Sequence, residues 1–158
     1  MPVKAQGRYS AVIYDDANHR SYSTIKPDLV VEDSLTQQAI PIDIKYKLYD
    51  AKKLSTGDIY QTFMYAFALG SRDAERRAGL VYPADSSRSG PALSVRPVDG
   101  PIAARITGAG LDVPAALDAL GNGIERAHVM QQVRQLVASI AGLNQLDLKA
   151  PSAGYKGL

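Results

Sequence analysis

Short apolar runs bounded by turn-forming residues mark the first half of the chain. The runs at residues 8–15 and 20–25 flank the turn-prone stretch 15–19 and predict a β-hairpin. The runs at residues 25–31 and 41–47 predict two more strands, joined by a polar connection. Residues 1–7 lack such a pattern, so we expect a loose lead-in before the hairpin.

The spacing of apolar residues becomes helical over residues 55–69. Ser55 with Asp58 three residues later resembles a capping box, and Gly70 is expected to end the helix. An apolar stripe on this helix is expected to face the core. It holds Ile59, Phe63 and Phe67. A polar stripe is predicted to point back at the preceding strand, although a cap and a half-buried helix face are the plainer interpretation. It holds Asp58, Gln61 and Tyr65.

The second half of the chain predicts a further mixture of strands and helices. Strands are expected at residues 78–83, 93–98 and 102–107, and helices at 114–120 and 123–141. Connections are expected at 71–77 (a loop or a short helix), 84–91 and 108–113. The long helix has an expected core-facing stripe. It consists of Ile124, Ala127, Met130, Val133, Val137 and Ile140. We expect one domain, residues 1–149, with a mobile tail at 150–158.

Composition narrows the class of protein. The chain has 158 residues, of which 46% are apolar and 22% charged, as in globular proteins. It has no cysteine, which excludes disulfides and thiolate metal sites. No apolar run approaches membrane length, so we expect a cytoplasmic protein with no membrane partner. The formal net charge of +2 is too small to indicate a nucleic-acid partner by itself.

Candidate chemistry gathers on two neighbouring predicted strands. Residues i and i+2 of a strand point to the same face, so Asp43 and Lys45 are expected to project together. If the strands pair, Asp28 can lie near Asp43. Two carboxylates and an ammonium are costly to bury unless a metal or a substrate answers the charge. Their oxygen atoms, with the main-chain carbonyl of Ile44, suit Mg²⁺, and Mn²⁺ as a substitute. The expected reaction is phosphodiester hydrolysis, in which Lys45 orients water or steadies charge on a phosphate.

Other polar residues carry weaker signals. The densest basic patch is either a solvated surface or a set of phosphate contacts. It consists of Lys45, Lys47, Lys52 and Lys53. His19 lies in the predicted turn and His128 on a helix, and both are interpreted as surface side chains rather than metal ligands. The nucleotide-binding patterns G-x-x-x-x-G-K-[ST] and G-x-G-x-x-G do not occur in the sequence.

The candidate residues resemble the motif of a known nuclease superfamily. Pro27-Asp28, followed by Asp43-Ile44-Lys45, is similar to the PD-(D/E)xK motif. The wider stretches at 42–47, 58–61 and 80–83 resemble the nuclease domain of McrC, the endonuclease subunit of modified-cytosine restriction systems.

The predicted helix extends the resemblance. Gln61 and Tyr65 are similar to the Q-x-x-x-Y motif of RecB-type nucleases. The resemblance covers about residues 9–83, and residues 84–158 carry no match that we identify. It implies an α/β (α+β) fold of restriction-endonuclease type, with a mixed central sheet flanked by helices.

The resemblance implies a Mg²⁺-dependent DNA endonuclease of a restriction or antiviral defence system. The metal ligands would be Asp28, Asp43 and Ile44. The catalytic residues would be Asp28, Asp43 and Lys45. Residues beside the metal site, or placing DNA, would be Asp58, Gln61 and Tyr65. Contacts to DNA phosphates would come from Lys47, Lys52 and Lys53.

The resemblance also implies partners and shows one departure. The partners would be DNA, a GTP-driven AAA+ motor of the McrB type and, for double-strand cutting, a second copy of the chain. Superfamily members usually have a helix before the first strand, often with a glutamate, and here no glutamate precedes Glu32. The region by which McrC docks on McrB is also missing. We therefore expect a fragment, a minimal stand-alone nuclease, or a piece completed by another polypeptide.

Two alternatives remain open. The chain could keep the nuclease fold as a non-catalytic nucleic-acid-binding or assembly module. It could also be a structural domain in which Asp28 and Lys45 form a salt bridge. The variant Lys45→Ala would abolish cleavage by a nuclease with only a modest loss of DNA binding, and in the structural case it would alter stability alone.

Overall fold

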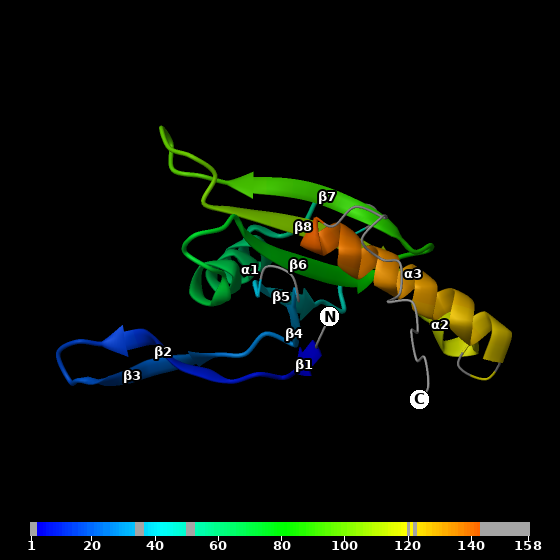
Figure 1. Ribbon diagram of the computed structural model, residues 1–158, viewed down its shortest axis with the longest axis horizontal. Helices are drawn as coiled ribbons and strands as arrows, with labels where there is room; N and C mark the ends of the chain where they lie inside the picture. Colours follow the sequence, from blue (N-terminus) through cyan, green and yellow to red (C-terminus); the bar gives the residue numbers. More distant parts are fainter. Residues whose placement is uncertain (1–2, 34–36, 50–52, 120, 122, 143–158) are drawn as a thin grey trace, which may run out of the picture.

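The computed structural model describes residues 3–33, 37–49, 53–119, 121 and 123–142. In these residues six strands form a mixed sheet in the order β1-β4-β5-β6-β8-β7, accompanied by three helices (Figure 1). The strands of this sheet are β1 (Val3–Ala5), β4 (Leu29–Glu32), β5 (Ala39–Ile44), β6 (Arg76–Pro83), β7 (Arg88–Val95) and β8 (Ala104–Leu111). The helices are α1 (Thr56–Leu69), α2 (Val113–Ala119) and α3 (Gly123–Ala141). This architecture confirms the expected α/β (α+β) fold of restriction-endonuclease type.

The centre of the sheet is a β-α-β unit. Strand β4 runs antiparallel to β5, with Leu29 opposite Ile42. Strand β5 runs parallel to β6, with Asp43 opposite Leu80. A parallel pair needs a crossover connection, and α1 makes that crossing. The chain therefore leaves the carboxyl end of β5, where Asp43 lies, and returns along α1 beside the same strand.

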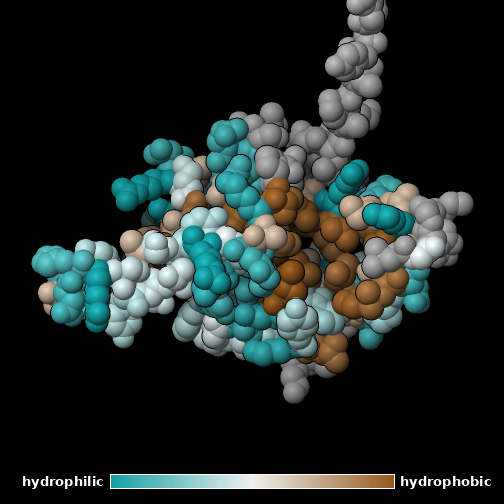
Figure 2. Space-filling view, turned by 90° about the horizontal axis from the view of Figure 1, so that it is seen from below, coloured by the Kyte–Doolittle hydropathy of each residue, from teal (hydrophilic) through white to brown (hydrophobic). Residues whose placement is uncertain are grey.

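The sheet buries an apolar core under α3. Because side chains alternate along a strand, Ile40 and Ile42 point to this face and Asp43 points to the other. The core cluster consists of Val31, Ile40, Ile42, Ala109, Leu136, Ile140 and Ala141. Glycine lets α3 approach closely, since a Cβ at Gly79 would lie 2.7 Å from the Ile140 side chain. Figure 2 shows one face of the molecule, with apolar residues gathered near the middle of that face and a hydrophilic to neutral arm at one side.

The inward face of α1 differs from the prediction. Its buried residues are Asp58, Thr62, Tyr65 and Ala66. The helix packs through Ala66 on two small residues of the sheet, Ala78 and Ala104, with Phe63 partly buried beside them. The expected apolar stripe is wrong at Phe67, which is 53% exposed. The guanidinium of Arg76 lies 4.7 Å from the centre of that ring, so the aromatic side chain packs on a cation at the surface.

Several predicted connections form strands instead. The lead-in contains β1, which pairs with β4 at the edge of the sheet, Val3 opposite Val31. Strand β6 begins at Arg76, within the charged connection. Strands β7 and β8 likewise extend into stretches expected to be loops because of their glycines. Those glycines give room to an aromatic side chain, since a Cβ at Gly90 would lie 2.5 Å from the Tyr82 hydroxyl.

The predicted hairpin is confirmed as a separate two-stranded sheet of β2 (Tyr9–Asp15) and β3 (Arg20–Ile25). It projects away from the sheet and helices (Figure 1). His19 is exposed at its turn, and His128 is exposed on α3, as expected of surface residues. The core-facing stripe of α3 is wrong at Ala127 and Met130, which are exposed. The expected tail at 150–158 lies outside the described residues.

Candidate functional site

The start of β4 is fastened to the end of β5 by a carboxylate. The main-chain N–H of Ile44 donates to Oδ2 of Asp28, with 2.7 Å between the two atoms. Pro27 is buried just before it, where its missing N–H removes no ladder bond because β4 begins only at Leu29. The two strands therefore pair as predicted, and the charge of Asp28 lies close enough to Asp43 to raise its pKa.

Asp43 and Lys45 form the centre of the site. The Asp43 side chain is buried, and its Oδ2 lies 2.6 Å from the Lys45 ammonium. Among the described residues, no donor is aligned for a regular hydrogen bond to this oxygen, so the ammonium meets it only as an ion pair. Burial raises the pKa of Asp43, Lys45 offsets part of that rise, and the charges of Asp28 and Asp58 add to it. The positive charge of Lys45 therefore does not fully compensate for the burial of the Asp43 carboxylate.

Lys45 is surrounded by acceptors. Besides Asp43, its Nζ lies 2.8 Å from Oε1 of Gln61 and 3.5 Å from Oδ1 of Asp58. Burial lowers the pKa of Lys45, but the close contact with the Asp43 carboxylate, together with the charge of Asp58, outweighs burial and raises it above its ordinary value. The side chain is therefore an ammonium at neutral pH, held inside the site.

Asp58 collects donors from three directions. Its Oδ2 accepts from the Tyr49 hydroxyl, the Ser55 hydroxyl and the Lys47 ammonium. Ser55 is the N-cap of α1 and accepts from the main-chain N–H of Asp58, as the capping pattern predicts. Burial raises the pKa of Asp58, but the hydrogen bonds from Ser55, Tyr49 and Lys47, with the Lys45 charge, lower it well below its ordinary range. Asp58 is thus a fixed negative charge.

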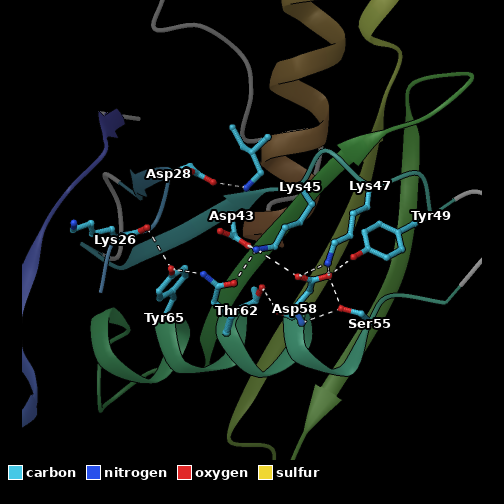
Figure 3. Close-up of polar contacts among 12 residues, drawn as sticks. Lys26, Asp28, Asp43, Lys45, Lys47, Tyr49, Ser55, Asp58, Thr62 and Tyr65 are labelled. Atoms are coloured by element: carbon cyan, nitrogen blue, oxygen red, sulfur yellow. Dashed lines mark hydrogen bonds and ion pairs between the residues drawn. The ribbon is translucent and has the colours of Figure 1, made fainter. Parts of the chain in front are cut away.

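A chain of hydrogen bonds joins Lys45 to the segment before Asp28 (Figure 3). Lys45 donates to Gln61, the Gln61 amide donates to the Tyr65 hydroxyl over 2.7 Å, and that hydroxyl donates to the main-chain carbonyl of Lys26 over 3.3 Å. The polar stripe of α1 therefore points at the site, as predicted, with Tyr65 buried and Gln61 exposed on that helix face.

The structure brings most of the predicted site residues together. Lys47 reaches the cluster through Asp58, with 3.1 Å between Nζ and Oδ2. Lys53 is exposed, and Lys52 lies outside the described residues. Within the described residues, Lys45 makes ion pairs with Asp43 and Asp58 and none with Asp28, so the salt bridge of the structural alternative is absent.

Sequence reasoning missed Tyr49. It lies in a stretch expected to be loop, where no periodic pattern marks an inward position. The ring is buried edge-on against Tyr82, with 5.4 Å between centroids, and this packing directs the hydroxyl to Asp58. An aromatic residue in a short loop, nine residues before the aspartate of the capping pattern, was the available signal.

The donor set fits a small, hard cation that keeps its own water. Among the residues that the structure describes, no three His, Cys, Asp or Glu side chains converge as a ligand group. The protein would therefore supply two carboxylates, Asp28 and Asp43, which is the number that Mg²⁺ commonly takes from protein. The buried oxygen of Asp43 without an aligned donor is the atom that such a cation would satisfy.

Comparison with known proteins gives one family. A family model described as McrBC 5-methylcytosine restriction system component matches residues 1–83, just over half of the 158 residues. The matched region contains every member of the cluster, from Asp28 to Tyr65. A search of curated proteins gives no match. None of the helices in the described residues is long and apolar enough to span a membrane.

Proposed function

The chain belongs to the family of McrBC 5-methylcytosine restriction system components, and from this premise we propose that it is a Mg²⁺-dependent DNA endonuclease of the PD-(D/E)xK superfamily. One observation carries the proposal. A buried carboxylate, Asp43, meets a lysine ammonium at 2.6 Å beside a second carboxylate, Asp28, at the carboxyl end of a central strand. Charges of both signs gathered in this way suit a reaction at a phosphate group, which brings its own negative charge.

The metal ligands would be the carboxylates of Asp28 and Asp43, with the main-chain carbonyl of Ile44. Mg²⁺ or Mn²⁺ bound there would make water a better nucleophile and stabilise charge on a phosphate oxygen. Asp28 already spans from the start of β4 to the end of β5, so one strand pair sets the separation of both carboxylates. The ligands therefore depend on β-sheet pairing rather than on a flexible loop.

Lys45 would act on the phosphate or on the attacking water. Its raised pKa keeps it an ammonium, so it would donate hydrogen bonds and stabilise negative charge as that charge grows in the transition state. Gln61 and Tyr65 would hold it in place, because their hydrogen bonds run from Lys45 to the main chain at Lys26. Preorganised donors of this kind lose little entropy when the reaction occurs.

DNA phosphates beyond the scissile bond would contact lysines near the site. Lys47 has a side chain that is 63% exposed although its ammonium touches Asp58, so it can reach solvent and a phosphate. Lys53 is exposed on the same connection, and Lys52 is proposed with it from the sequence. Membership of the family implies a partner in a restriction complex, for which we propose a GTP-driven AAA+ motor of the McrB type, and a second copy of the chain for double-strand cutting.

The test is plasmid cleavage by the full chain with Mg²⁺ or Mn²⁺, on methylated and unmethylated DNA. Asp43→Ala is the test variant, and Asp99→Ala, an exposed aspartate in the β7–β8 connection, is the matched control. Nicking that EDTA and Asp43→Ala abolish, and that Asp99→Ala retains, supports the proposal. Absence of both cleavage and metal-induced stabilisation in the unaltered chain would overturn it in favour of a non-catalytic module that binds nucleic acid or assists assembly.

A further inference from the structure

Asp58 is a buried charge that has no part in the proposed cleavage step. Only 7% of it is exposed, and it lies on α1, away from the strands that carry Asp28 and Asp43. Its Oδ2 is occupied by Tyr49, Ser55 and Lys47. Its Oδ1 lies 3.5 Å from the Lys45 ammonium and 3.5 Å from the Lys47 ammonium. A helix cap needs only the first of these oxygens, so capping leaves the second unexplained.

The Lys45 ammonium and a bound cation would compete for the same carboxylate, that of Asp43. An ammonium carries three donors, and three acceptors surround this one: Asp43 at 2.6 Å, Gln61 at 2.8 Å and Asp58 at 3.5 Å. The nearest acceptor is also a proposed metal ligand. A divalent cation and an ammonium repel each other, so a cation at Asp43 would drive Lys45 towards whatever anion remains nearby.

We propose that Asp58 is the positioning residue that keeps the Lys45 ammonium in the site when Asp43 binds Mg²⁺. This inference rests on the proposed function. Asp58 suits the task because Tyr49 and Ser55 fix its carboxylate, and because Oδ1 faces the ammonium. Gln61 is a neutral acceptor and cannot offset the repulsion alone. Without the charge of Asp58, the ammonium would compete with the metal for Asp43, and metal binding would weaken.

The experiment measures Mn²⁺ affinity of the full chain by calorimetry, and cleavage kinetics in parallel. For Asp58→Asn we expect Mn²⁺ to bind about tenfold more weakly, and kcat to fall while KM for DNA stays within about twofold. Asp112→Asn is the matched control, since Asp112 also caps a helix, accepting from the Ala115 N–H at the start of α2, and within the described residues has no contact with the cluster. It should leave Mn²⁺ affinity within about twofold.

A double variant separates action through Lys45 from the simple loss of a nearby negative charge. In a Lys45→Ala background, Asp58→Asn should change Mn²⁺ affinity by less than about twofold, because the competing ammonium is gone. Equal weakening in both backgrounds would overturn the inference, as would unchanged affinity in the single variant. If Asp58→Asn fails to fold, Tyr49→Phe replaces it, with an expected loss of about two- to threefold and the same contrary outcome.

The unaltered chain shows which proposal has failed. If it binds Mn²⁺ and cleaves DNA while Asp58→Asn matches it in both, only the role of Asp58 is wrong. If it neither binds metal nor cleaves, the proposed function fails first, and the role of Asp58 fails with it.

Discussion

Strand β5 contributes side chains to both faces of the central sheet, and the two faces bury side chains of opposite character. Under α3, Ile40 and Ile42 of β5 pack in an apolar cluster with Ile140. Under α1, the neighbouring Asp43 is buried against a lysine and within reach of two further aspartates. Successive residues of one strand therefore go to a region that favours folding and to a region that opposes it.

The difference shows where stability and chemistry come from. The α3 face gains free energy from each apolar side chain that leaves water. The α1 face loses part of that free energy, because it buries charges that are not fully compensated. The raised pKa of Asp43 and its oxygen without an aligned donor indicate this. Substitutions on the α1 face should therefore lower activity more than stability. Substitutions on the α3 face should lower stability more than activity.

The largest expected effect is on cleavage. Lys45→Ala should lower the cleavage rate by about 10²–10³-fold, because the ammonium that would stabilise charge on the phosphate is lost. Its melting temperature should fall more in EDTA than in Mg²⁺, since a bound cation would offset part of the lost ammonium charge only when Mg²⁺ is present. The measurements are single-turnover cleavage and thermal melting under both conditions. Cleavage at the unaltered rate would place Lys45 outside the reaction.

The opposite pattern is expected on the α3 face. Ile140→Ala should lower the free energy of unfolding by about 2–5 kcal/mol, because a fully buried side chain leaves a cavity. Cleavage per folded molecule should stay within about twofold, which urea unfolding and a cleavage assay at low temperature can check. Met130→Ala is the control, because that side chain is 47% exposed on the same helix. A strong loss of cleavage by folded Ile140→Ala would mean that the faces are coupled.

A smaller effect should show how much the buried charge of Asp43 lowers the stability of the metal-free protein. Asp43→Asn should stabilise the metal-free protein by on the order of 1 kcal/mol, because it removes a buried charge from among others. Mg²⁺ should not stabilise this variant, whereas we expect it to stabilise the unaltered chain. Thermal melting with EDTA and with Mg²⁺ measures both. A metal-free variant less stable than the unaltered chain would show that the ion pair with Lys45 outweighs burial.

The smallest expected effect is a difference in pH dependence between the two aspartates. The pKa of Asp58 is lowered on folding, so its contribution to stability is present above about pH 4 and is lost as pH falls below that value. The pKa of Asp43 is raised, so its destabilising contribution grows as pH rises above about pH 4. In metal-free buffer at neutral pH, we therefore expect Asp58→Asn to be less stable than the unaltered chain and Asp43→Asn to be more stable. Both differences in the free energy of unfolding should shrink towards zero at acid pH. Parallel unfolding curves at all pH values would contradict both assignments.

Local patterns predicted much of the fold and most of the site. Strand alternation placed Asp43 and Lys45 together, and helical spacing aligned Asp58, Gln61 and Tyr65. Both rules depend only on residues a few positions apart. The pairing of β4 with β5 followed from two neighbouring apolar runs, and it brought Asp28 to Ile44.

The features that were not predicted depend on contacts between distant residues. Phe67 belongs to the apolar stripe of its helix, yet the narrow contact of Ala66 with the sheet leaves it outside. The glycines of β7 and β8 have the composition of a loop, and they form strands because Tyr82 packs across them. Tyr49 joined the site through the same aromatic side chain. No periodicity within a segment can report such packing.

The arrangement of the hydrogen bonds along the chain also bears on the order of folding. The polar contacts of the site join residues no more than 39 positions apart, as between Tyr65 and Lys26. The α3 face is closed by more distant contacts, and the bond from Arg77 to the Ala141 carbonyl spans 64 positions. Closing a shorter loop loses less chain entropy and is generally faster. During synthesis from the N-terminus, the charged cluster can therefore form while α3 is still to be made, and α3 then packs on a sheet whose other face already carries that cluster.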